Sequence, residues 1–200
     1  MSRPLHLVIF GRQGAGKGTQ SLNIAETYGC VHVSTGDMLR AAIAAETEMG
    51  KAVKAILDSG ALVDDDTMEG LVSERLAQDD IVASGVLLDG FPRTPAQAEA
   101  LVTILGSRSI DAAINLEVPI EEVTDRMLAR GRDDDTPEAI AQRLELYESQ
   151  TRPLLEWFDQ HGLLVVVDGL GTEDEVFARV RAALDARTGD SQVVTPEAEE

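Results

Sequence analysis

A glycine-rich segment near the amino terminus constrains this chain more than any other feature. It reads Gly-Arg-Gln-Gly-Ala-Gly-Lys-Gly-Thr over residues 11–19, after an apolar run at 5–10 and before a helical stretch that continues to about Tyr28. Glycines let backbone N–H groups turn around an anion, and the helix N-terminus and Lys17 add positive charge. The segment therefore predicts a phosphate-binding loop, although Gly18 separates the lysine from Thr19, whereas the general pattern has Ser or Thr directly after the lysine.

The rest of the chain alternates apolar runs with helical patterns. Further strands are expected at 31–34, 85–89, 112–118 and 163–168. Thr94 with Gln97 and Thr172 with Glu175 fit capping boxes, and Thr136 precedes a proline at a first helical position. Strands that alternate with helices at this spacing predict a parallel sheet with helices on both faces.

The charge of the chain limits its partners. Its 200 residues suit one domain and include 17 Lys and Arg against 36 Asp and Glu, a net charge of −19. A field of this sign repels nucleic acids and anionic membranes, so neither is expected as a partner. No apolar run approaches the roughly 20 residues of a membrane helix, and the single cysteine, Cys30, cannot form an internal disulfide. We expect a cytoplasmic monomer.

Arginines supply most of the positive charge. Only Lys17, Lys51 and Lys54 are lysines, so fourteen of the 17 cations are arginines, which suit bidentate phosphate contacts. Four of them fall within eighteen residues, at 126, 130, 132 and 143. A solvated surface is the usual explanation of a charge run. In so acidic a chain, however, the cluster favours a polyanion site, and phosphoryl transfer depends mainly on positioning and charge stabilisation.

Four motifs, taken in order, resemble the adenylate kinase family. They are Gly-Lys-Gly-Thr-Gln at 16–20, Ser-Thr-Gly-Asp-Met-Leu-Arg at 34–40, Leu-Leu-Asp-Gly-Phe-Pro-Arg-Thr at 87–94 and the arginines from 126 to 143. The resemblance extends from about residue 5 to 185. It implies an α/β P-loop fold of three layers with a five-stranded parallel sheet, a helical AMP-binding arm and a short lid. The implied boundaries are core 1–33, 64–129 and 137–187, arm 34–63 and lid 130–136, within a single domain over 1–187. Residues 188–200 are polar and acidic and include Pro196, so a disordered tail is expected there.

The resemblance also implies an activity, the reversible transfer of the terminal phosphoryl group of Mg-ATP to AMP, which gives two ADP. Catalysis is assigned to Lys17, Arg93, Arg126, Arg130, Arg132 and Arg143. ATP contacts are assigned to Gly14, Ala15, Gly16, Lys17, Gly18, Thr19, Arg126, Arg130 and Gly171. AMP contacts are assigned to Thr35, Arg40, Ala61, Leu62, Val63, Gly90, Phe91, Pro92, Arg93, Gln97, Arg132 and Arg143.

A magnesium ion is the expected cofactor. Asp89 ends an apolar run beside the predicted loop, where one carboxylate can orient water around Mg²⁺, although Asp89-Gly90 also suits a plain turn. No zinc site is expected, because the predicted lid at 130–136 contains neither Cys nor His.

Several alternatives remain open at this point. Thr35 and Gln97 could serve only as helix-capping residues, and the acidic run 133–135 could hold the neighbouring arginines in place or begin a helix. A UMP/CMP-type kinase would use the same chemistry. A GTPase switch lacks support, since the chain has no Asn-Lys-x-Asp motif. A catalytically weak nucleotide-binding protein is also considered, because Gln13 stands where the family commonly has proline in the phosphate loop.

Overall fold

The computed structural model describes residues 3–59, 63–131 and 135–189. Within them, five parallel strands form one sheet in the order β2-β3-β1-β4-β5. The strands are β1 (Leu5–Gly11), β2 (Val31–Ser34), β3 (Gly85–Asp89), β4 (Ala112–Glu117) and β5 (Leu164–Asp168). Each predicted strand is confirmed to within one residue at either end. All five carboxyl ends lie at one edge of the sheet, because the strands are parallel.

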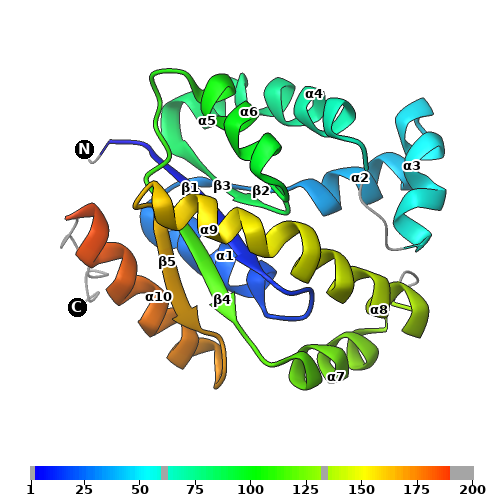
Figure 1. Ribbon diagram of the computed structural model, residues 1–200. Coiled ribbons are helices and arrows are strands. Elements are labelled where there is room, and N and C mark those ends of the chain that lie inside the picture. Colours follow the sequence, from blue (N-terminus) through cyan, green and yellow to red (C-terminus); the bar gives the residue numbers. More distant parts are fainter. Residues whose placement is uncertain (1–2, 60–62, 132–134, 190–200) are drawn as a thin grey trace, which may run out of the picture.

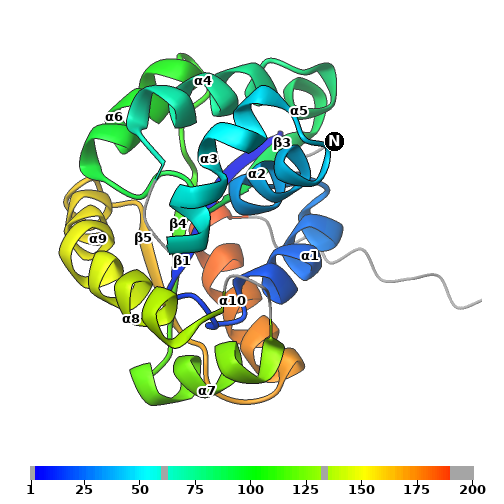
Figure 2. The same ribbon diagram turned by 90° about the vertical axis from the view of Figure 1, so that its right-hand side faces the viewer.

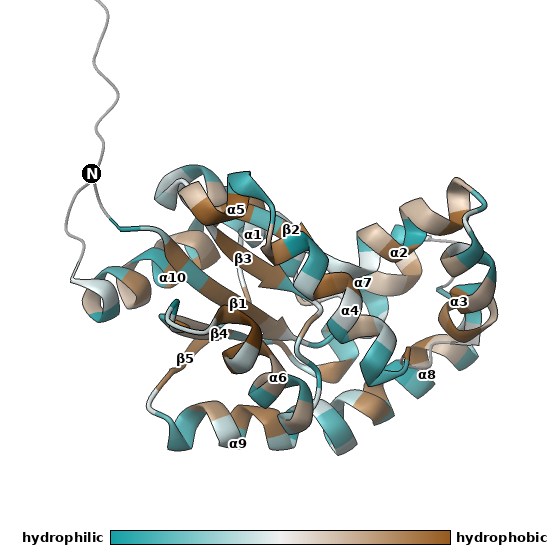
Figure 3. Ribbon diagram, turned by 90° about the horizontal axis from the view of Figure 1, so that it is seen from above, coloured by the Kyte–Doolittle hydropathy of each residue, from teal (hydrophilic) through white to brown (hydrophobic). Residues whose placement is uncertain are grey.

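Side chains along β1 alternate between two cores. Leu7 and Ile9 face a core that includes Ile24 of α1 (Lys17–Tyr28) and Val180 of α10 (Glu173–Thr188). The neighbouring residues Val8 and Phe10 face the opposite core, which is completed by α4 (Asp65–Leu76), α6 (Pro95–Leu105) and α9 (Arg152–Gln160). The sheet is therefore the middle of three layers, with α9 across one face and α1 across the other (Figures 1 and 2). Figure 3 shows the apolar character of the strands that results from burial on both faces.

The remaining helices lie around the carboxyl edge of the sheet or connect its strands. They are α2 (Thr35–Ala44), α3 (Glu48–Ser59), α5 (Asp79–Ser84), α7 (Ile120–Arg130) and α8 (Pro137–Leu146). A five-residue π-helical segment, η1 (Tyr147–Thr151), joins α8 to α9. Helices α2 and α3 pack together, and α3 also contacts α8 (Figure 1). The pair α2 and α3 thus approaches the pair α7 and α8 beyond the carboxyl ends of the strands.

The starts of α8 and α10 follow the predicted capping signals, whereas α2 begins at a different capping residue. Thr136 accepts a hydrogen bond from the backbone of Ala139, and Thr172 with Glu175 forms a complete capping box. At α2 the capping side chain is Ser34, which accepts from the N–H of Asp37. Thr35 instead donates from Oγ1 to the carbonyl of Asp89, at 3.3 Å.

The last helix of the described chain is α10. Helix α10 ends at Thr188, the first residue of the predicted tail, and residues 190–200 lie outside the described part of the chain. No helix among the described residues has the length and apolar character needed to cross a membrane.

Candidate active site

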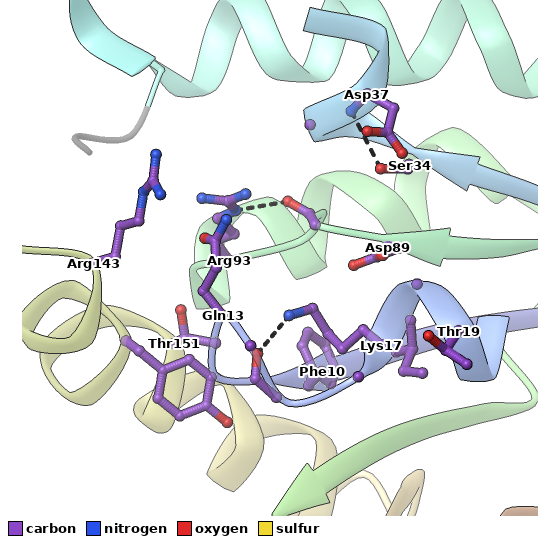
Figure 4. Close-up of a pocket in the computed structure, with 18 of the residues that line it drawn as sticks. Phe10, Gln13, Lys17, Thr19, Ser34, Asp37, Asp89, Arg93, Arg143 and Thr151 are labelled. Atoms are coloured by element: carbon purple, nitrogen blue, oxygen red, sulfur yellow. Dashed lines mark hydrogen bonds between the residues drawn. The ribbon is translucent and has the colours of Figure 1, made fainter. Parts of the chain in front are cut away.

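A cavity of about 800 Å³ opens beyond the carboxyl ends of β1, β2 and β3. Open parallel sheets characteristically bind ligands at this edge. The segment after β1 forms its floor, while α2, α7 and α8 contribute its walls. Figure 4 shows Lys17, Asp89, Arg93 and Arg143 approaching this space from different elements. The lining includes these predicted site residues: Gly14, Gly16, Lys17, Gly18, Thr19, Arg40, Asp89, Gly90, Pro92, Arg93, Arg126, Arg130 and Arg143.

The glycine-rich loop has the backbone geometry of an anion cradle. Gly14 and Gly16 have φ values of 87° and 92°, which residues with side chains rarely adopt. A Cβ atom on Gly14 would meet the carbonyl oxygen of Val123 in α7 at 2.6 Å. The Lys17 ammonium donates to the carbonyls of Gly11 at 2.9 Å and Arg12 at 3.2 Å. The loop thus folds tightly against α7 and holds Lys17 over its own backbone.

Asp89 is the carboxylate that faces Lys17. Burial would raise the pKa of Asp89, but His32, Lys17 and Arg93 together hold it below its ordinary value. The Nε2 atom of His32 lies 3.8 Å from Oδ2 of Asp89. The carboxylate is therefore ionised at neutral pH. No cluster of three metal-ligating side chains occurs in the described residues, but Mg²⁺ needs only one or two carboxylates beside phosphates and water. The site chemistry therefore suits hydrated Mg²⁺ on a nucleotide.

Three guanidinium groups influence one another in the cavity. Burial lowers the pKa of Arg93, the neighbouring cations Arg143 and Arg40 lower it further, and Asp89 opposes them. Arg93 is also fixed in place, since its Nε donates to the carbonyl of Gly90 at 2.8 Å (Figure 4). Like charges held together in a partly buried space repel one another. A polyanion between them would relieve that repulsion.

Each of the described site arginines that flank Arg93 also bonds a carboxylate. Arg40 bonds Asp37 in α2, and Arg126 donates from Nε to Glu122 in α7 at 2.7 Å. The same oxygen of Asp135 accepts from Arg130 at 2.8 Å and from Arg143 at 3.2 Å. The side chain of Asp135 is fully buried. Of the two interpretations of the acidic run 133–135, Asp135 therefore fits the one in which it holds neighbouring arginines, and Thr136 begins the helix.

The side-chain amide of Gln97 is completely oriented by the protein. Its Oε1 accepts from the backbone N–H of Arg93 at 2.8 Å, and its Nε2 donates to Oδ1 of Asp65. Thr94 does cap α6 by accepting from the N–H of Gln97, as expected. The prediction of a reciprocal bond between the Gln97 side chain and the backbone of Thr94 is wrong, because Oε1 accepts from the backbone N–H of Arg93 instead. The sequence offered no signal for Asp65 beyond its place in the acidic first turn of α4.

Other predicted site residues lie beside or away from the cavity. Predicted site residues that are buried but do not line the cavity are Ala15, Thr35, Val63, Phe91 and Gln97. Gly171 lies in the turn after β5 and does not line it. Ala61, Leu62 and Arg132, together with residues 133 and 134, lie outside the described residues. Lining residues that carry no sequence motif include Phe10, Leu22, His32, Leu146, Tyr147, Thr151 and Glu173.

The comparison with known proteins agrees with this geometry. A family model described as adenylate kinase matches residues 9–163, which contain the loop, Asp89 and every described arginine of the cavity. The chain belongs to the adenylate kinase family. It is 46% identical over 186 residues to an adenylate kinase of Stenotrophomonas maltophilia. The alignment covers 90% of this chain and 99% of that protein. An adenylate kinase of Maricaulis maris is 47% identical over 189 residues, or 92% of this chain and all of the relative.

A more distant adenylate kinase, from Thermodesulfovibrio yellowstonii, is 40% identical and is also covered over its full length. Membership in the adenylate kinase family makes the chain a phosphotransferase with a nucleotide-binding P-loop fold. These comparisons support the adenylate kinase interpretation and do not favour the UMP/CMP-type kinase or the catalytically weak nucleotide-binding protein.

Proposed function

We propose that this cavity transfers the terminal phosphoryl group of Mg-ATP to AMP and releases two ADP. The observation that carries this proposal is the convergence of Lys17 and five arginines on one cavity beside an ionised Asp89. The triphosphate of ATP and the phosphate of AMP repel each other strongly unless cations lie between them. A cavity with this charge distribution supplies those cations in a chain whose net charge is −19.

The donor nucleotide would occupy the half of the cavity next to the glycine-rich loop. Backbone N–H groups from Gly14 to Thr19 and the Lys17 ammonium would bind its phosphates, helped by the N-terminus of α1. When bound, Mg²⁺ neutralises part of the charge on the terminal phosphates. Asp89 would hold it through water, and Arg126 and Arg130 would bind the phosphates from the opposite wall.

The acceptor would occupy the half of the cavity between α2 and the end of β3. Arg40 and Arg93 would bind the AMP phosphate, with Arg132 and Arg143 approaching from the other side. Gln97 and Thr35 would lie at the adenine, with backbone and apolar atoms of Ala61, Leu62, Val63, Gly90, Phe91 and Pro92 around it. We propose that residues 34–63 act as the acceptor arm, that 130–136 act as a short lid, and that Gly171 contacts the donor adenine.

Transfer then requires little covalent help from the protein. A phosphate oxygen of AMP bonds to the γ-phosphorus while the bond from that phosphorus to the β,γ-bridging oxygen breaks, and the ATP remnant leaves as ADP. The attacking oxygen is already anionic near neutral pH, so no general base is needed. The arginines orient both phosphates and stabilise the charge of the loose transition state. Closure of the lid would exclude water, the competing acceptor.

A coupled assay for ADP tests this function. The chain should form ADP from Mg-ATP with AMP and much less with CMP, UMP or GMP, because the fixed Gln97 amide matches an adenine edge. A preference for CMP or UMP would make the chain a UMP/CMP-type kinase. ATP binding with no ADP from any acceptor would make it a catalytically weak nucleotide-binding protein. We also propose that the enzyme is a cytoplasmic monomer without a nucleic-acid or membrane partner, in keeping with its charge.

A further inference from the structure

Arg12 belongs to the glycine-rich loop, yet its side chain bonds structural elements far along the chain. Its Nη1 donates to the carbonyl of Val118, just after β4, at 3.1 Å. Its Nε donates to Oε1 of Glu148 at 3.0 Å, and Nη2 bonds the same oxygen. The guanidinium carbon also lies 5.3 Å from the centre of the Tyr147 ring, within the range of a cation–π contact. Three different groups thus fix one side chain that is 21% exposed.

The anchors of Arg12 are themselves held in place. Tyr147 donates from its hydroxyl to Oδ1 of the buried Asn115 in β4, at 3.1 Å. Glu148 also accepts from Arg152 at 3.0 Å. Both anchors lie in η1, the π-helical segment that directly follows α8. Such segments are uncommon and recur at functional sites. Because α8 carries Arg143, the contacts of Arg12 join the loop to the helix that supplies a cavity arginine.

The backbone of Arg12 connects this anchor to Lys17. Its carbonyl oxygen accepts from the Lys17 ammonium at 3.2 Å and from the N–H of Ala15 at 3.0 Å. A side chain held at three points restricts the position of its own carbonyl, and therefore of the groups bonded to that carbonyl. The loop that curves around the phosphates and the lysine that binds them share this one support.

We propose that Arg12 is a positioning residue that fastens the phosphate loop and Lys17 to the π-helical segment η1. The fork geometry of arginine makes this possible, since one guanidinium bonds a carbonyl and a carboxylate together. The inference rests on the proposed function only in that the loop binds the phosphates of ATP. It concerns a residue outside the predicted set of catalytic and binding residues.

Substitution of Arg12 should affect ATP more than AMP. In Arg12→Ala the KM for ATP should rise roughly tenfold, whereas the KM for AMP should change less than twofold, because the loosened loop lies in the donor half. The dissociation constant for ATP, measured by calorimetry without AMP, should rise by a similar factor. Arg12→Lys, which keeps the charge but not the fork, should recover only part of the loss.

Glu148 supplies the second arm of the experiment. Glu148→Ala should raise the KM for ATP in the same way, and the double variant should be no worse than the more affected single variant, because both changes break one link. The matched control is Arg152→Ala, which removes an exposed cation from the same carboxylate without touching the loop. It should change both KM values much less than Glu148→Ala does, because Arg12 keeps its own bond to Oε1 of Glu148.

The outcomes separate this inference from the proposed function. Equal changes in both KM values, no change in either, or effects of Arg12→Ala and Glu148→Ala that multiply in the double variant would each overturn the positioning role. If Arg12→Ala does not fold, as judged by circular dichroism and melting, Glu148→Ala provides the same comparison with the loop sequence intact. Failure of the wild-type chain to form ADP would overturn the proposed function, whereas normal ATP binding by Arg12→Ala would overturn only this inference.

Discussion

The side-chain amide of Gln97 donates from Nε2 to Oδ1 of Asp65, at a distance of 2.6 Å. This bond fixes which end of the amide is oxygen and which is nitrogen, since the oxygen already accepts from Arg93. Asp65→Ala should therefore free the amide to rotate. We expect the KM for AMP to rise roughly threefold to tenfold, the size of effect that loss of one ordinary hydrogen bond gives, and discrimination against CMP to weaken.

The acceptor panel measures this effect. Asp66→Ala is the matched control, since it removes the same charge from the same helical turn at an exposed position. Equal changes in acceptor preference in both variants would assign the effect to the helix N-terminus and not to Gln97.

Arg93 and Arg126 should contribute to the rate more than to stability. Alanine or lysine at either position should lower kcat by about 10²–10³, as expected when a group that stabilises transition-state charge is lost. The far-ultraviolet circular dichroism spectrum should not change. Arg181→Ala, in which an exposed arginine on α10 is removed, is the control and should retain full turnover. Wild-type turnover in both cavity variants would contradict their proposed roles.

Asp135 should matter for both stability and ligand response. Its removal leaves Arg130 and Arg143 without their shared carboxylate, so Asp135→Ala should lower the free energy of unfolding by on the order of 2 kcal/mol. Added ATP should raise the melting temperature of the variant more than that of the wild type, because phosphate replaces the missing negative charge. Asp58→Ala, at an exposed ion pair with Lys54, should show neither effect. An equal ATP response in variant and wild type would contradict this role.

Gly14 and Gly18 should respond differently to the same substitution. A methyl group at Gly14 meets the Val123 carbonyl at 2.6 Å and forces alanine to a φ of 87°, whereas at Gly18 nothing lies within 4 Å. Gly14→Ala should therefore cost about 1–3 kcal/mol of stability, and Gly18→Ala should cost little. Thermal denaturation of both variants measures the difference. Similar melting temperatures would mean that the loop does not need this approach to α7.

Acid should destabilise the fold through His6. Burial lowers the pKa of this histidine; Asp111 opposes the shift, and Arg108 and Arg3 add to it. The folded protein therefore binds a proton less readily than the unfolded chain, whose histidine pKa is about 6.5. The free energy of unfolding should therefore be greatest above about pH 6.5. It should fall as the pH drops from there through the lower pKa that His6 has in the folded protein.

Chemical denaturation between pH 5 and pH 7.5 measures this loss, in a range where few carboxylates titrate. His6→Gln should flatten the curve over this range, while His161→Gln, at an exposed position, should not. An unchanged slope in His6→Gln would assign the acid sensitivity to other groups.

The sheet could be predicted from the sequence because its three central strands, β3, β1 and β4, are buried on both faces. Such strands appear as short apolar runs, and glycine or polar residues mark their ends, as Gly11 and Asp89 do here. The phosphate loop could also be predicted from the sequence, since its nine residues are contiguous. The elements around the carboxyl edge were placed only approximately, because several short helices follow one another there and only short segments separate them.

The contacts that orient the site could not be predicted in the same way. Asp65 reaches Gln97, and Glu148 reaches Arg12, across separations of 32 and 136 residues. No local spacing encodes such pairs, since they depend on how the helices pack over the sheet. The Gln97 capping box failed for a related reason, because a backbone N–H one residue earlier lay within reach of the same oxygen.

The carboxylate that Arg130 and Arg143 share has a consequence for which anions can enter the cavity. A monovalent anion such as chloride gains little by competing with Asp135, because it exchanges one partner for another of equal charge. We expect a nucleotide phosphate chain, which can bridge several guanidinium groups at once, to displace the Asp135 carboxylate. The shared carboxylate should therefore favour the binding of multivalent anions over that of simple salts.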